Sequence, residues 1–232
     1  MKAIPQPAGR PARGTPVWWG RILVESVLIV FSILLALFVD EWRDQRHLDE
    51  QRDRALSDIH SEIVLNLAAV DEVVDYHRTV RDSLGALLQR LGTDRAGASA
   101  WELAQGAAPA GIQRPGVTGI AWQTAAASEA VALLDIGLTN RLGSLYDIQA
   151  KGVESTIERV QELLFDPILF DPARAVAVLR VLQALAHELA GQEIYLAQRY
   201  REILADPAFT ELERDRRESE TGTGAAETGE SR

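Results

Sequence analysis

The 232-residue sequence contains no cysteine, which excludes structural disulfides and thiolate metal sites. It also lacks a P-loop, the glycine-rich fingerprint of dinucleotide-binding proteins and a Gly-x-Ser-x-Gly nucleophile motif. Its net charge is −10, and no concentrated basic patch is present to neutralise phosphates, so we expect no nucleic-acid partner. Since no motif names a reaction, we expect a non-enzymatic protein without a cofactor.

The four histidines are placed unfavourably for metal chemistry. Di-iron bundles use Glu-x-x-His on paired helices. Only His47 has a carboxylate three residues before it, Asp44, and both lie just after a long apolar run. His187-Glu188 begins like a zincin motif, but the residue four positions after His187 is Gly191. We therefore expect no metal site.

The most informative feature is one apolar run at residues 22–39, bracketed by Trp18, Trp19 and Trp42. A helix of this length rises about 27 Å, close to the ~30 Å hydrocarbon thickness of a bilayer. Tryptophan favours the interface between water and lipid. The pattern predicts one membrane helix over residues 17–42, with the lipid bilayer as partner and the three tryptophans at its interfaces.

Two other interpretations of this run are open. A cleaved signal peptide requires small residues just past the apolar run, whereas this run ends in Asp40-Glu41-Trp42. A buried helix of a soluble core is the second alternative, because Glu25, Ser26 and Ser32 dilute the apolar character. The uncleaved anchor is the favoured interpretation.

Charge around the run indicates its orientation. The first 21 residues carry Lys2, Arg10, Arg13 and Arg21 and no acid, whereas the rest of the chain is acidic. Basic residues near a membrane helix favour the cytoplasmic side, although four arginines also follow the run, at positions 43, 46, 52 and 54. We expect a bacterial inner-membrane protein with a cytoplasmic N-terminus and a periplasmic C-terminal domain.

Beyond the run, the chain has no convincing period-two pattern and is expected to be all-α. We expect a disordered leader at residues 1–16, a bundle of three to four helices at residues 43–208 that continues the membrane helix, and a disordered acidic tail at residues 209–232.

Apolar residues follow a spacing of three and four along the first long helix, which Gly92 is expected to end. This stripe comprises Leu56, Ile59, Ile63, Asn66, Val70, Val73, His77, Val80, Leu84, Leu87 and Leu91. Further helices are predicted at residues 98–105, 119–134, 136–164 and 172–205, with Asp135 and Asp171 as N-caps.

Within the predicted membrane helix, Glu25, Ser32 and Ala36 lie on one face, within about 20° at 100° per residue. Ser32 and Ala36 form a small-xxx-small pair, which allows another helix to approach closely. These residues predict helix association, as a homo-oligomer or with another membrane protein. Alternatively, Glu25 only marks the membrane boundary.

Two polar residues, Asn66 and His77, interrupt the apolar stripe. We interpret both as packing and register residues, since a buried polar side chain specifies alignment; a titrating or ligating role for His77 is the alternative. Trp122 and Tyr146 are expected as core anchors, because each combines a large apolar ring with a polar atom.

Two stretches resemble an uncharacterised family of bacterial single-pass membrane proteins. The first combines Glu25, the apolar run and Trp42-Arg43, with Ser32 where the family pattern has glycine. The second has Trp-x-x-Ala and then Leu-Leu-Asp…Leu…Tyr, carried by Trp122, Ala125, Leu133, Leu134, Asp135, Leu138, Leu142 and Tyr146. The resemblance implies a fold and a location but no chemistry.

Together, the patterns predict a membrane-anchored, non-enzymatic helical protein for interaction or sensing. The alternatives are a membrane-tethered enzyme and a small-ligand-binding module, either with a carboxylate-lined pocket that forms only in three dimensions.

Overall fold

The computed structural model describes residues 17–92, 97–214 and 217, with side chains from Leu23 onward. Every regular element in these ranges is helical, which confirms the predicted all-α class. The chain divides into two compact units, Met1–Asp49 and Glu50–Arg232, which are described separately.

The first unit contains the beginning of α1, a helix that spans Val17–Leu91. Large apolar side chains from Leu23 to Val39 are 50–69% exposed. Among the described residues, α1 alone is long and apolar enough to cross a membrane, and none of its apolar window is buried. The apolar part of α1, Leu23 to Val39, is therefore unlike a buried core helix. The predicted leader, residues 1–16, lies outside the described residues.

In the second unit, the predicted apolar stripe faces the core. Its members from Leu56 to Leu84 are at most 9% exposed, and Asn66 and His77 are buried with the rest. Helix α1 ends at Leu91, as expected, because Gly92 adopts a left-handed backbone with φ +61° and donates from its N–H to the carbonyl of Leu88.

Helix α2, Ala100–Ala107, begins with a capping box in which Ser99 and Glu102 each bond the other's backbone N–H. Its position differs by two residues from the predicted one. The adjoining segment, residues 108–119, is irregular in structure.

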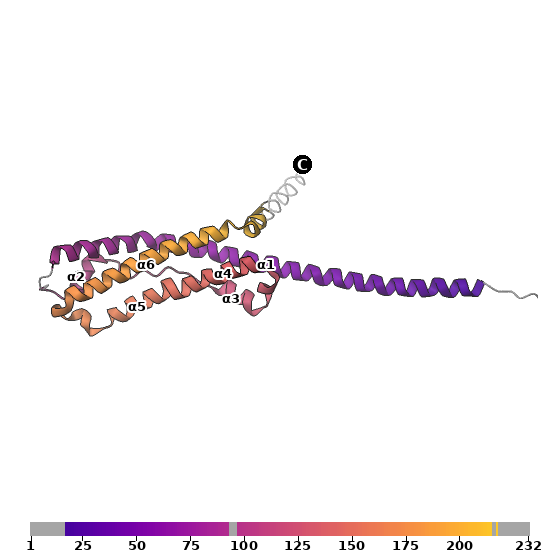
Figure 1. The fold of residues 1–232 in the computed structure, drawn as a ribbon, viewed down its shortest axis with the longest axis horizontal. Helices are drawn as coiled ribbons and strands as arrows, with labels where there is room; N and C mark the ends of the chain where they lie inside the picture. The colour runs from indigo at the N-terminus through magenta and orange to yellow at the C-terminus, as the bar shows by residue number, and fades with distance from the viewer. Residues whose placement is uncertain (1–16, 93–96, 215–216, 218–232) are drawn as a thin grey trace, which may run out of the picture. The chain divides into compact units, whose positions relative to one another are not determined.

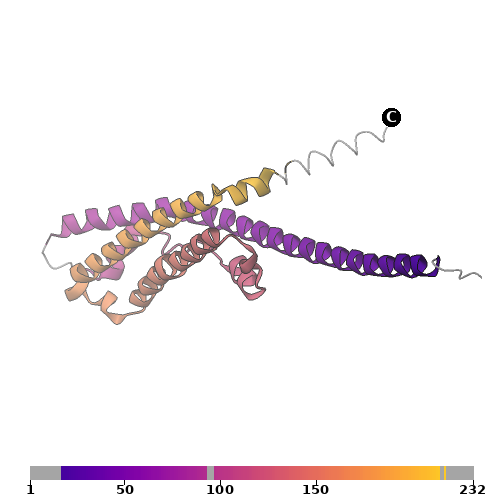
Figure 2. The same ribbon diagram turned by 45° about the vertical axis from the view of Figure 1, so that its right-hand side comes forward.

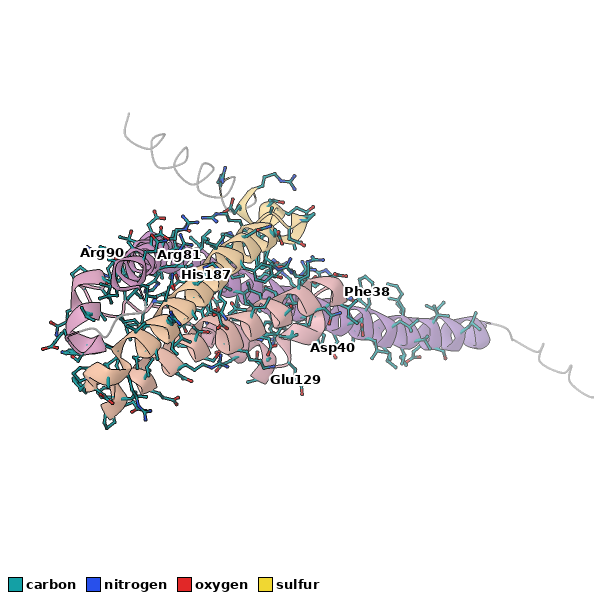
Figure 3. All side chains as sticks on the ribbon, turned by 60° about the vertical axis from the view of Figure 1, so that its left-hand side comes forward. Phe38, Asp40, Arg81, Arg90, Glu129 and His187 are labelled. Atoms are coloured by element: carbon teal, nitrogen blue, oxygen red, sulfur yellow. The ribbon has the colours of Figure 1, made fainter. Side chains whose placement is uncertain are left out.

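The single helix predicted at residues 119–134 is instead two pieces, α3 at Ile120–Ala127 and a 3-10 turn at Ala130–Leu133. They meet at Glu129, whose φ is 60° (Figure 3). A straight helix at 100° per residue would place Ala130 and Leu134 on the face opposite Ala125. The turn allows all three to be buried.

The helix predicted at residues 136–164 is continuous but not uniform. It consists of α4, Ile136–Ile148, a π-helical stretch, Gln149–Glu154, and α5, Ser155–Leu164. The predicted N-cap is confirmed, since the side chain of Asp135 accepts a 3.0 Å hydrogen bond from the N–H of Leu138.

The last long helix, α6, spans Ala175–Leu204 and follows two 3-10 turns at Pro167–Phe170 and Pro172–Arg174. Asp171 caps the second turn, so the regular helix starts three residues later than predicted. Figures 1 and 2 show α6 alongside the second half of α1 and alongside α4 and α5, which form the predicted bundle.

The tail predicted at residues 209–232 begins inside a helical segment. Residues 207–214 are helical, and Phe209 is 0% exposed beside the ring of His60, with ring centroids 5.5 Å apart. Ala208 and Leu212 also pack against this core, so the segment buries apolar area despite its charged residues. Residues 218–232 lie outside the described residues.

Candidate functional site

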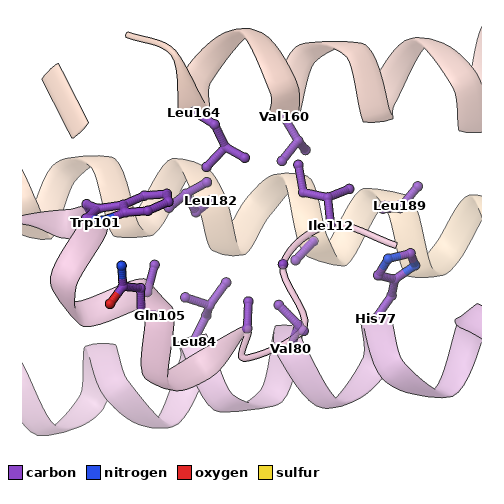
Figure 4. Close-up of a pocket in the computed structure, with 14 residues that line it drawn as sticks. His77, Val80, Leu84, Trp101, Gln105, Ile112, Val160, Leu164, Leu182 and Leu189 are labelled. Atoms are coloured by element: carbon purple, nitrogen blue, oxygen red, sulfur yellow. The ribbon is translucent and has the colours of Figure 1, made fainter. Parts of the chain in front are cut away.

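A partly open cavity of about 170 Å³ lies within the second unit, lined by residues of α1, α2, α5 and α6 and of the segment 108–112. Its lining is almost entirely apolar: Val80, Leu84, Ala104, Ala108, Ile112, Val160, Leu164, Leu182, Ala186 and Leu189, with Trp101, Gln105, Gly111 and His77. Figure 4 shows His77 and Trp101 toward opposite ends of this lining. No carboxylate lines the cavity in the described chain.

His77 is one half of a buried polar pair with Glu193 on α6. Its Nδ1 lies 2.8 Å from Oε1 and 2.9 Å from Oε2 of Glu193. Glu193 is 0% exposed and His77 is 4% exposed. The other ring nitrogen, Nε2, is buried and has no hydrogen-bond partner. His77 therefore joins α1 to α6 through Glu193, and it lines the cavity with one unsatisfied polar atom.

Asn66 fixes the irregular segment between α2 and α3 against α1. Its Nδ2 donates 2.6 Å to the carbonyl of Thr118, and its Oδ1 accepts 2.9 Å from the N–H of the same residue. The Oε1 atom of Gln149, the first residue of the π-helical stretch, lies 3.4 Å from Asn66 Nδ2. The same oxygen accepts a 2.6 Å hydrogen bond from the hydroxyl of Tyr200. The amide of Asn66 thus links α1 to Thr118 and to the π-helical stretch.

The rings of Trp122 and Tyr146 stack on each other, with their centroids 5.7 Å apart and their planes at 8°. Tyr146 is 7% exposed, whereas Trp122 is half-buried. The hydroxyl of Tyr146 donates 2.7 Å to Glu62, a buried carboxylate that also accepts from the N–H of Ala121 at 2.9 Å. Glu62 therefore ties α1 to both α3 and α4.

The hydroxyl groups of two buried tyrosines have raised pKa values. Burial, reinforced by the hydrogen bond to Glu62, raises the pKa of Tyr146 far above its ordinary value. Burial also raises the pKa of Tyr200, against the opposing effect of its contact with Asn66. Both phenols therefore keep their protons at neutral pH, and neither lines the cavity.

The predicted membrane residues lie in the first unit. Glu25, Ser32 and Ala36 are all exposed. The Ser32 hydroxyl donates 2.7 Å to the carbonyl of Leu28 in its own helix, so it needs no other partner in an apolar medium. Trp42 is 58% exposed, with the guanidinium of Arg46 5.6 Å from its ring centroid. The side chains of Trp18 and Trp19 lie outside the described residues.

Sequence reasoning missed Glu62 and Glu193, the two buried carboxylates that partner Tyr146 and His77. A usable signal existed for both. Glu193 lies four residues after Leu189 and seven before Tyr200, on the buried face of α6. Glu62 directly precedes Ile63 and lies three residues after Ile59, beside the apolar stripe.

No group of three or more His, Asp, Glu or Cys side chains that could hold a metal occurs among the residues with described positions. No family model, curated protein or solved structure matches this chain.

Proposed function

We propose that this protein is a single-pass protein of the bacterial inner membrane, anchored by the first part of α1, with a non-enzymatic role in interaction or sensing. The observation that carries the proposal is the exposed apolar run from Leu23 to Val39. Each Leu, Ile, Phe or Val near the centre of a membrane helix favours insertion by about 0.3–0.6 kcal/mol. Such a surface is unfavourable in water and favourable in lipid.

The ends of this run support a transmembrane position. Glu25 lies within one turn of its start, and Asp40 and Glu41 follow Val39, so the ionisable groups lie near the two interfaces. Trp42 is exposed at the second boundary, where an indole ring suits the headgroup region. The basic leader favours a cytoplasmic N-terminus, which would place residues after Trp42 in the periplasm.

Association within the membrane is the second part of the proposal. Glu25, Ser32 and Ala36 share one face of the helix, and small side chains there allow close backbone approach. The Ser32 hydroxyl is already bonded to its own helix, so close packing rather than a hydrogen bond from Ser32 would drive the contact. The partner is a second copy of this chain or another membrane helix.

A role in interaction or sensing, rather than catalysis, is supported by the character of the cavity. An acid–base enzyme brings together titratable groups around a reacting atom. The described lining contains one histidine and no carboxylate. Membership of the single-pass family that the sequence resembles is supported by the stacking of Trp122 on Tyr146 and by the burial of Ala125, Leu138 and Leu142.

Membrane anchoring is tested by fractionating bacteria that express the full-length chain. We expect the protein in the membrane pellet after alkaline carbonate extraction, with an N-terminal sequence that begins at the leader. Leu34→Arg combined with Val30→Arg should move it to the supernatant. The matched control is Leu65→Arg, at a position on the same helix that is 67% exposed but outside the apolar run. Wild-type protein in the supernatant, or an N-terminus after Trp42, would overturn the anchor.

Topology requires a separate readout. Alkaline phosphatase fused after Arg217 is active only in the periplasm, and green fluorescent protein fused there matures only in the cytoplasm. We expect phosphatase activity without fluorescence. The reverse result would place the domain in the cytoplasm and leave the anchor intact.

A further inference from the structure

The cavity at His77 has the features of a binding site for a small molecule. We infer that it binds a compact, neutral, hydrophobic molecule with one hydroxyl group that forms a hydrogen bond with His77 Nε2. This goes beyond the proposed function and does not depend on it, because every lining residue belongs to the unit Glu50–Arg232.

The size of the cavity limits the ligand. At about 170 Å³ it is slightly larger than an engineered apolar cavity of ~150 Å³ that stays dry and binds benzene. A single aromatic ring with a short substituent therefore fits, whereas a drug-sized ligand needs a pocket of about 300 Å³ or more.

The walls determine the polarity of the ligand. Leu and Val side chains from α1, α5 and α6 face the same space, and Ala104 and Ala108 form the side contributed by α2 and its C-cap. Such walls cannot solvate a charge or several hydroxyl groups. The ligand is therefore hydrophobic over most of its surface.

The direction of the imidazole determines where the polar atom of the ligand must lie. Nδ1 is held by Glu193, and the two nitrogens of an imidazole point in nearly opposite directions. Nε2 is buried without a partner in a side chain that is 5% exposed. A polar atom in that state is uncommon in folded proteins and is relieved by a bound water or ligand.

A hydroxyl group can bond Nε2 whichever tautomer the imidazole adopts. A ring nitrogen donates when it carries a proton and accepts when it does not, and a hydroxyl does both.

The polar group of the ligand is therefore a hydroxyl. A carboxylate or an ammonium group would bring an uncompensated charge into an apolar cavity. Trp101, at the other end of the lining in Figure 4, is 37% exposed. The ligand therefore enters beside this ring, with its oxygen atom directed toward His77.

The proposal is tested on the full-length chain in lipid nanodiscs with ¹⁵N-labelled histidine. Benzyl alcohol is the probe, and toluene, which has the same ring without the oxygen, is its comparison. We expect benzyl alcohol to shift the Nε2 resonance of His77 in a saturable manner. We expect toluene to bind about tenfold more weakly, the loss of affinity that removal of one hydrogen bond typically causes.

Two variants separate binding in the cavity from partition into lipid. Ala186→Leu on α6 fills the cavity and should abolish saturable binding, whereas Ala184→Leu, at an exposed position of the same helix, should bind as wild type. The paired change His77→Phe with Glu193→Leu removes the imidazole without leaving a lone buried carboxylate. It should bind the two probes with equal affinity, as followed by the methyl resonances of Leu182 and Leu189.

The inference is overturned by any of three results: no saturable shift in wild type, equal binding by the two alanine variants, or no preference of wild type for benzyl alcohol over toluene. Each variant is also fractionated as described for the anchor. A protein that fails to pellet with membranes but binds benzyl alcohol refutes the anchor alone. A protein that pellets but does not bind refutes the cavity ligand alone.

Discussion

Tyr146 on α4 donates a 2.7 Å hydrogen bond to Glu62 on α1, a partner 84 residues earlier in the chain. The same carboxylate accepts from the backbone N–H groups of Ala121 at 2.9 Å and Trp122 at 3.5 Å, at the start of α3. A carboxylate at a helix N-terminus is favoured by the unpaired N–H groups there. One side chain thus joins three helices and holds the ring of Tyr146 against that of Trp122.

Removal of this carboxylate should destabilise the domain. Glu62→Ala leaves the Tyr146 hydroxyl and the N–H of Ala121 without an acceptor, and we expect a loss of about 3 kcal/mol in the free energy of unfolding. Glu62→Gln keeps one acceptor and should lose about 1–2 kcal/mol. Urea denaturation of the full-length protein in detergent measures both. The control is Glu72→Gln, at an exposed position on α1, which should change stability by less than about 0.5 kcal/mol.

Alkaline pH should destabilise the fold through its buried tyrosines. Burial raises the pKa of Tyr146 and Tyr200 in the folded protein, so both keep their protons above pH 10, where the unfolded chain releases them. The folded state then binds more protons than the unfolded state. Stability present below pH 10 should therefore fall as pH rises, by about 1.4 kcal/mol per pH unit for each tyrosine.

Tyr146→Phe combined with Tyr200→Phe should flatten this alkaline decline by about 3 kcal/mol per pH unit at pH 11 and by less nearer pH 10, where the unfolded phenols are only partly ionised. Tyr195→Phe removes a tyrosine that is 50% exposed and should leave the decline as in wild type. The measurement is the free energy of unfolding between pH 9 and 11. An unchanged slope in the double variant would show that neither buried phenol differs between the folded and unfolded states.

Local patterns in the sequence predicted much of this fold. The three-and-four spacing from Leu56 to Leu84 identified the buried face of α1, because a helix places those positions on one side. Asp135 and Gly92 mark helix ends through bonds to residues only three or four positions away. Such features depend on neighbouring residues, so a single sequence reveals them.

Features that depend on distant partners were not predictable. Burial of Glu193 is compensated by His77, 116 residues earlier, and that pairing exists only once α1 and α6 pack. The left-handed turn at Glu129 was hidden because alanine-rich residues around it favour a helix locally. Phe209 looked like part of a charged tail, although its ring lies in the core beside His60.

The two hydrogen bonds between Asn66 and Thr118 should keep the irregular segment before α3 in one conformation. Asn66→Leu removes a donor to the Thr118 carbonyl and an acceptor for its N–H. We expect amide exchange of Thr118 to accelerate about tenfold or more, the factor that corresponds to ~1.4 kcal/mol of local protection. Amide exchange in the middle of α6 serves as the internal reference. Equal exchange at Thr118 in the variant and wild type would contradict this role for Asn66.

Phe209 should anchor residues 207–214 to the domain. Phe209→Ala removes a fully buried ring, a change that costs about 3–5 kcal/mol in protein cores. We expect this short helical segment to detach and become a preferred site of limited proteolysis, because little else in it is buried. Phe165→Ala removes a ring that is 87% exposed and should give the wild-type cleavage pattern. Cleavage that is identical in both variants would show that the segment is held by other contacts.

Helix association in the membrane should depend on the face that carries Ser32 and Ala36. Because the chain has no cysteine, single cysteines can be placed at each position from Glu25 to Ala36 without background. We expect disulfide crosslinking in native membranes to peak at Ser32 and Ala36 and to be lowest at positions about half a turn away.

Ala36→Leu should reduce crosslinking through Ser32→Cys, since a large side chain separates the helices. Leu35→Ala, on a neighbouring face, should leave that crosslinking unchanged. Uniform or absent crosslinking along the helix would remove the association surface but would not affect the cavity at His77, which lies in the other unit.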